Sequence, residues 1–184
     1  MTTAMKDEIE RALAPLVGLP LWGAGRESNM LSLQLGERRP SPTRADPGRE
    51  VGGYTLHVYC AWRLARGAAL LAGSGDLFTP ADPDEELETF DHDAPGATWW
   101  DARVAAYLGA ATGDGRPAPT VTAVGADALG GVRVALSDGA ALEVFPNSSA
   151  AERFETEFWR LRRPGSDEDD VVVGTFGLER QYRG

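Results

Sequence analysis

The chain has 184 residues, of which 42% are hydrophobic, and this is enough for one domain with a substantial buried core. Its formal net charge is −10, so it repels phosphate backbones and is not expected to bind nucleic acid. Its apolar runs fall short of the roughly 20 residues that a membrane helix needs, so no membrane span is expected.

The residue usage predicts a bacterial protein of the cytoplasm. Of its 18 basic residues only Lys6 is a lysine, which is typical of a high-GC genome, so the arginines are not interpreted as a phosphate-binding design. The single cysteine, Cys60, excludes an internal disulfide and fits a reducing cytosol. The N-terminus has no basic segment followed by an apolar stretch, so no secretory signal is expected. We expect one domain over 1–184.

The first third of the chain predicts a helix, two strands and a long loop. Apolar residues at helical spacing predict an amphipathic helix over 3–14, which Pro15 ends. Alternating leucines over 31–35 predict a strand, and its antiparallel partner is expected over 19–24. Residues 37–53 are rich in Pro, Arg and Gly and are expected to form a mobile loop.

The longest alternation of the chain covers residues 54–65 and predicts one continuous strand. Residues 68–71 are expected to return as its hairpin partner, followed by a turn over 73–76. The strand predicts a core-facing side made of alternate residues, namely Tyr54, Leu56, Val58, Cys60, Trp62 and Leu64. The acidic segment 80–96 is bounded by prolines and is expected to be a solvated, mobile loop.

A helix over 98–110, capped by Thr98, precedes three consecutive strands over 120–146. The last two of these strands favour a three-residue loop that ends in Gly139 at positive φ. This register keeps one face apolar and sets Arg133 opposite Glu143. We therefore interpret Glu143 as an ion-pair partner rather than a catalytic carboxylate.

The C-terminal part predicts a short helix, capped by Asn147 or Ser148 and running through Phe154 and Phe158. A strand over 159–162, a mobile acidic loop at 165–170 and a last strand over 171–173 follow. The sum is an α+β domain with a mostly antiparallel, curved sheet of about seven to nine strands and two or three helices.

Three constellations suggest chemistry. His57 and Cys60 are an odd number of residues apart, so a strand points them to opposite faces, and Cys60 is predicted to lie in the core. Ser74 and Asp76 could meet His57 across neighbouring strands, which leaves a hydrolase-type site as an alternative. The acidic loop resembles a calcium loop but has Leu87 where the glycine is required. No metal and no cofactor is expected.

A polar patch on the sheet is the preferred binding surface. His57, Tyr59 and Arg63 share the polar face of the predicted 54–65 strand, and Arg26 and Asp76 lie in turns beside it. If the faces align, these five residues form a patch with both charge signs and an aromatic ring.

Three blocks of sequence carry a resemblance: LPLWGAGRESNMLSLQLG at 19–36, YTLHVYCAWRLARGAALLAGSGD at 54–76 and GGVRVALSDGAALEVFP at 130–146. Together they resemble a family of small bacterial proteins without known activity, whose similar blocks end with a strand like Trp159-Arg160. The resemblance covers about half of the chain and implies a cytosolic single-domain protein. It implies no particular activity.

Two hypotheses of function follow. The first is a non-enzymatic module that binds a protein partner and is immunity-like, because small acidic α+β proteins of bacteria resemble immunity proteins in size and charge. The alternative is a small hydrolase-type enzyme that uses His57 with Asp76 or Ser74. The oligomeric state stays open.

Overall fold

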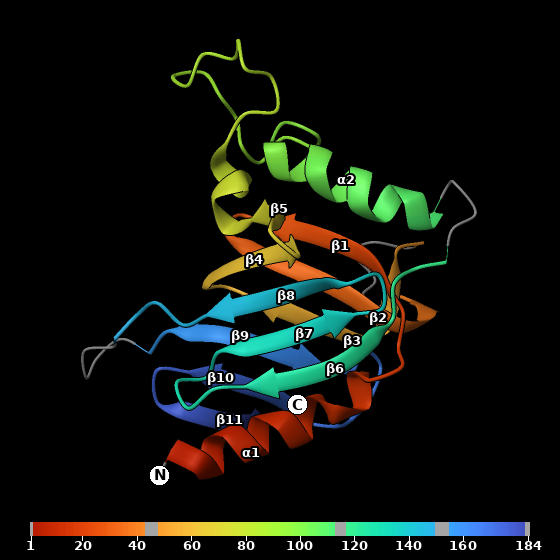
Figure 1. The fold of residues 1–184 in the computed structure, drawn as a ribbon, viewed down its shortest axis with the longest axis vertical. Helices are drawn as coiled ribbons and strands as arrows, with labels where there is room; N and C mark the ends of the chain where they lie inside the picture. Colours follow the sequence, from red (N-terminus) through yellow and green to blue (C-terminus); the bar gives the residue numbers. More distant parts are fainter. Residues whose placement is uncertain (1, 43–47, 113–116, 150–154, 183–184) are drawn as a thin grey trace.

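The computed structural model describes residues 2–42, 48–112, 117–149 and 155–182. Two antiparallel sheets pack face to face, and one α-helix lies at each end of the sandwich (Figure 1). The apolar sides of both sheets meet in one core, because an amphipathic sheet must bury its apolar face against another layer.

The larger sheet has six strands in the order β1-β2-β3-β9-β10-β11. Their bounds, in that order, are Leu21–Glu27, Met30–Pro40, Glu50–Val58, Glu157–Arg162, Asp170–Gly174 and Gly177–Gln181. The smaller sheet has five strands in the order β5-β4-β8-β7-β6. Their bounds are Ala69–Gly73, Ala61–Arg66, Ala140–Phe145, Val132–Leu136 and Val121–Ala126.

The two helices close the open sides of the sandwich. Helix α1 (Thr2–Leu13) and the 3₁₀ turn η1 (Ala14–Leu16) lie beside the edge strands β6 and β11. Helix α2 (Trp99–Thr112) contacts the opposite edge strands, β1 and β5, and the 3₁₀ turn η2 (Ser74–Phe78). Edge strands expose unpaired backbone groups, so covering each edge pair with a helix protects the sheets from pairing with other chains. No helix in the described ranges is long and apolar enough to cross a membrane.

The predicted α+β class and the antiparallel pairing are confirmed, whereas the number of strands is not. The described residues form eleven strands in two sheets, not seven to nine in one. Strand β11 was not predicted, because its sequence GLERQ shows no apolar alternation. It is held by backbone pairing with β10 over five residue pairs, from Asp170↔Gln181 to Gly174↔Gly177.

The prediction of one continuous strand over 54–65 is wrong. Strand β3 ends at Val58 and β4 begins at Ala61, and the chain passes between them from the larger sheet to the smaller. Both sheets face the same core, so inward and outward positions keep alternating through the crossing. Cys60 and Trp62 are buried, as predicted, with exposures of 7% and 4%.

Two segments expected to be irregular differ from their predictions. The 37–53 loop is shorter, because β2 and β3 extend into it and pair Arg38 with Gly52. Residues 43–47 lie outside the described part of the chain, as do residues 150–154, which include Phe154. The helix predicted to run through Phe158 is wrong at that end, since Phe158 lies in β9 and is buried.

The hairpin of β7 and β8 has the predicted register. Val134 pairs with Leu142, and Arg133 pairs with Glu143. Gly139 closes the loop with φ of 83°, a conformation that favours glycine. The determinants of this hairpin are local, which is why the sequence alone could specify it.

Helix α2 begins where it was predicted to begin. The Thr98 hydroxyl accepts a hydrogen bond from the Asp101 backbone N–H at 3.3 Å, and the Asp101 carboxylate accepts one from the Thr98 N–H at 3.1 Å. This reciprocal pair is a capping box, which satisfies N–H groups that a helix start leaves without partners. Asp101 is thereby fixed at the N-terminus of α2, beside the acidic loop.

Candidate functional site

The five residues of the predicted polar patch lie in four separate places. His57 and Tyr59 are at the outer face of the larger sheet, and Arg63 is on the outer face of the smaller sheet. Arg26 is buried under α2, and Asp76 lies in η2. The division follows from the crossing between β3 and β4, which belong to different sheets. The outer faces of the two sheets point in opposite directions, so outward side chains of β3 and β4 point away from each other.

His57 lies in the middle of the larger sheet, opposite Ser32 on one side and Arg160 on the other. Its ring meets that of Tyr59 edge-on, with centroids 6.4 Å apart. Burial, together with the positive charges of Arg162 and Arg160, lowers the pKa of His57 from 6.5 to about 4. The imidazole is therefore neutral at pH 7 and is a weak base there.

The arginine beside His57 is held by acidic neighbours. Arg160 donates to both carboxylate oxygens of Glu157 at 2.6 Å and to Asp170 at 3.3 Å. Asp170 is 1% exposed and also lies 3.1 Å from the Arg162 guanidinium. Two arginines and two carboxylates thus balance in charge, and this outer face presents a neutral, hydrogen-bonded network rather than a charged site.

His57 makes the stability of the protein depend on pH in a defined window. We expect protonation to disfavour the folded state as pH falls from 6.5 to about 4, because only the unfolded chain accepts the proton readily there. With allowance for partial exposure, the loss is on the order of 2 kcal/mol. Urea unfolding at pH 4.5 and 7.5 should show a smaller pH effect in His57→Gln than in the wild type.

The carboxylates titrate in the same window, so the readout is the difference between variants. His92→Gln is the matched control, because His92 is the other histidine of the chain and its side chain is 38% exposed. An equal pH effect in the wild type and in His57→Gln would show that His57 is not the group responsible.

Arg26 is a structural clamp. Its side chain is 7% exposed, and it forms a two-pronged ion pair with Asp101 at 3.0 and 2.8 Å. The same guanidinium donates to the backbone carbonyls of His92 and Ala94, so it fastens the acidic loop to β1 and α2. A buried guanidinium with these partners has little capacity left for a ligand.

Ser74 and Asp76 lie together in η2, and both have local partners. The Gly73 backbone N–H donates to the Asp76 carboxylate at 2.8 Å, and the Trp62 N–H donates to the Ser74 hydroxyl at 3.4 Å. His57, the third member of the hydrolase-type alternative, belongs to the other sheet. None of the described residues belongs to a group of three or more His, Cys, Asp or Glu side chains suited to a metal ion.

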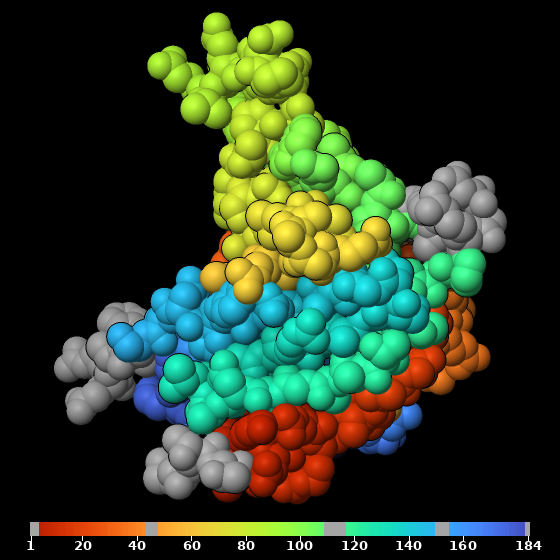
Figure 2. Space-filling view, viewed as in Figure 1, coloured from red at the N-terminus to blue at the C-terminus, as the bar shows by residue number. Residues whose placement is uncertain are grey.

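The outer face of the smaller sheet carries a row of one leucine and four alanines across all its strands. Paired positions on β5, β4, β8, β7 and β6 form this alanine row, which consists of Leu70, Ala65, Ala141, Ala135 and Ala123. Leu70, at one end, is 62% exposed. The methyl groups leave the sheet surface low, and neither helix covers this face (Figure 2).

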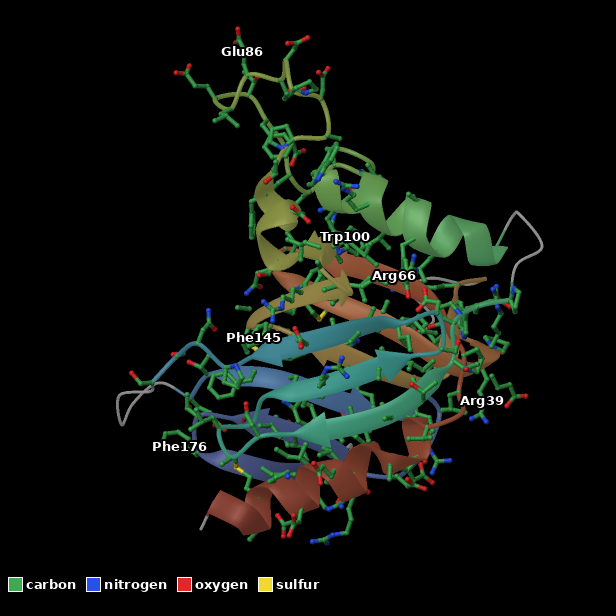
Figure 3. All side chains as sticks on the ribbon, in the orientation of Figure 1. Arg39, Arg66, Glu86, Trp100, Phe145 and Phe176 are labelled. Carbon is green, nitrogen blue, oxygen red and sulfur yellow. The ribbon has the colours of Figure 1, made fainter. Side chains whose placement is uncertain are left out.

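A second row on the same face bears charge. Paired positions place Arg63, Glu143 and Arg133 side by side on β4, β8 and β7. Glu143 accepts from Arg63 at 2.6 Å and lies 3.5 Å from Arg133, so one carboxylate serves two guanidiniums. The Arg63 guanidinium also lies over the exposed Phe145 ring, 5.0 Å from its centroid. Phe145 is at the end of β8 (Figure 3). This charged row has a net charge of +1.

The two rows border an open hollow of about 610 Å³, which we name the groove. Its lining includes Ala65 and Ala141, the side chain of Leu70 at the end of the alanine row, and all three members of the charged row. Of the predicted patch, Arg63 alone lies here. The small outward residues were not predicted as a site, because their alignment depends on the order of five strands, which the sequence does not state.

Comparisons of the chain with protein-family models, with curated proteins and with solved structures find no match.

Proposed function

We propose that the protein is a non-enzymatic binding protein whose groove receives an extended segment of a partner protein. The observation that carries this proposal is the groove of about 610 Å³ on an outer sheet face, with a floor of alanines and an exposed Leu70. A surface that combines exposed apolar and charged side chains is typical of protein interaction sites. Arginine and aromatic side chains, here Arg63 and Phe145, are the types that dominate binding energy at such sites.

The two rows define the chemistry of the segment. The low alanine floor allows a partner backbone to approach closely, and an apolar side chain of the segment packs against Leu70. Because Arg63 and Arg133 share the single carboxylate of Glu143, an acidic group of the segment supplies the missing negative charge. The segment is therefore expected to carry an apolar and an acidic side chain.

The acidic loop acts at longer range. It projects from the end of the molecule near α2, away from the sheets, with Glu86 at its tip (Figures 1 and 3). Together with the net charge of −10, it favours a partner with a basic surface and accelerates the encounter. An immunity-like role, in which a small acidic protein covers a basic toxin, is the form of the proposal that this charge favours.

Photo-crosslinking tests whether the groove is the contact surface. Benzoylphenylalanine at Leu70 should trap a defined partner in cells of the native host, and the adduct can be identified by mass spectrometry. The same probe at Leu129, a residue of the β6–β7 turn that is 76% exposed, is the control for accessibility. Trapping of the same proteins at both positions would contradict the proposal.

Substitutions in the alanine row then test the groove with the purified partner. Ala65→Arg should weaken binding about thirtyfold, the loss of a ~2 kcal/mol hot spot, because its side chain fills the groove floor. Ala123→Arg adds the same side chain at the β6 end of the row, outside the groove, and should leave affinity unchanged. Equal affinities of the two variants, measured by calorimetry, would remove the groove from the interface.

A further inference from the structure

A second hollow lies at the corner where α1 ends beside the larger sheet. It has a volume of about 190 Å³ and is lined by side chains of α1, η1, β3, β9, β10 and β11 and of the loop between β9 and β10. Three of these are arginines from separate parts of the chain, namely Arg11, Arg163 and Arg180. We infer that this corner pocket binds a small organic anion, independently of the proposed groove.

The sheet itself explains why an arginine enters the pocket from β11. On the core-facing side, Leu161 of β9 pairs with Val171 of β10, which pairs with Arg180 of β11. The first two are buried at 5% and 6% exposure. The third position is at the sheet edge, and it lines the pocket together with Pro15 of η1. The guanidinium thus shares a pocket with an apolar wall.

The charges around the pocket leave an excess of one positive charge. Arg163 forms an ion pair with Glu168 and lies over the Tyr54 ring, 5.2 Å from its centroid. In the ranges that the structure describes, neither Arg11 nor Arg180 takes part in an ion pair. The lining contains two carboxylates, Glu168 and Asp169, and three guanidiniums. Its net charge is therefore +1, whereas the net charge of the whole protein is −10.

The walls define the class of ligand. Arg11 and Arg180 offer charge-assisted hydrogen bonds to a carboxylate or a phosphate monoester. The carbon surface of Leu161, Val171 and the Tyr54 ring suits an apolar or aromatic group attached to that anion. A bare inorganic ion would leave this carbon surface without a partner. A phenyl-sized group with one anionic substituent combines both requirements.

Calorimetry with the full chain tests this assignment using phenyl phosphate and benzoate as probes. We expect saturable binding of at least one of them, and which of the two binds distinguishes a phosphate ester from a carboxylate. Phenol lacks the anion and inorganic phosphate lacks the ring, so each should bind at least tenfold more weakly. Absence of binding for both probes at 10 mM, or inorganic phosphate binding as tightly as they do, would overturn the assignment.

Arg11→Gln and Arg180→Gln locate the site. Each should weaken probe binding about tenfold, the value of one charge-assisted hydrogen bond, and added salt should weaken wild-type binding. Arg103→Gln removes an exposed arginine of α2 and should change nothing. A second measurement uses only the wild type, so it does not depend on the folding of a variant. In NMR spectra, the amide shifts that the probe induces should concentrate at Ala12, Leu161 and Arg180. Unchanged affinity in both variants, or shifts concentrated elsewhere, would refute the corner pocket.

Discussion

Replacement of Arg26 by methionine is expected to lower the free energy of unfolding by about 3 kcal/mol. Methionine keeps much of the side-chain volume but removes the charge that holds Asp101, whose side chain is 19% exposed. It also leaves the carbonyls of His92 and Ala94 without their donor. Burial alone would raise the pKa of Asp101, but hydrogen bonds from Arg26 and Thr98 hold that pKa below its usual value.

Urea unfolding measures the size of the effect, and Arg39→Met is its matched control. Arg39 also forms an ion pair, with Glu37 at 2.9 Å, but the two side chains are 46% and 72% exposed. Exposed pairs contribute about 0–1 kcal/mol, so this variant should unfold almost as the wild type does. Equal losses in Arg26→Met and Arg39→Met would contradict the clamp.

Hydrogen exchange shows where the loss occurs. The clamp joins the acidic loop to α2, so in Arg26→Met the amides of Ala81 and Ala97 should exchange faster. Both amides donate within the loop, to Ala97 O and Ala94 O at 2.8 and 3.2 Å. Amides of β6 and β7 should be protected as before, because α2 contacts β5 at the opposite edge of the smaller sheet. Uniformly faster exchange would indicate a global effect instead.

Local patterns in the sequence were sufficient for the elements whose determinants are local. The β7–β8 register followed from alternating apolar residues and one glycine, Gly139. The start of α2 followed from Thr98. In both cases the residues that decide the structure lie within a few positions of one another, so no knowledge of the remaining chain was required.

The candidate site could not be predicted because it depends on how distant strands meet. Alternation through residues 54–65 is continuous even though the chain changes sheet at Tyr59–Cys60, since both sheets share one core. The predicted polar patch requires a single sheet, whereas β3 and β4 belong to two sheets, so its residues are separated. Arg26 is an equally clear case, because its ionic partner is 75 positions away.

The groove and the corner pocket have the same origin. The small and charged residues that border them come from several strands and helices, and none of them belongs to a sequence motif. Ala65 and Ala141 become one floor only through the pairing of β4 with β8. Arg11 and Arg180 become neighbours of one pocket only because α1 lies against β11. Both proposals of binding therefore rest on sheet topology rather than on any motif.

Gly52→Ala is expected to lower the free energy of unfolding by about 3 kcal/mol, at the upper end of overpacking effects. The added Cβ would lie 2.5 Å from Tyr54 O and 2.6 Å from both N and O of Leu35. All three atoms belong to backbone, which cannot move aside as a flexible side chain can. The register of β2 and β3 shifts between Leu35 and Arg38, and the Gly52 N–H donates to the Gln34 side chain at 2.9 Å.

The neighbouring glycine supplies the control for this prediction. A Cβ at Gly53 would come no closer than 3.7 Å to its nearest neighbour, Glu37 N, which is an ordinary van der Waals contact. Gly53→Ala should therefore stay within about 1 kcal/mol of the wild type, partly because alanine restricts the unfolded chain. Urea midpoints of the two variants measure the difference. Equal urea midpoints for Gly52→Ala and Gly53→Ala would refute the close backbone packing at Gly52. They would also contradict the register shift between β2 and β3 at this position.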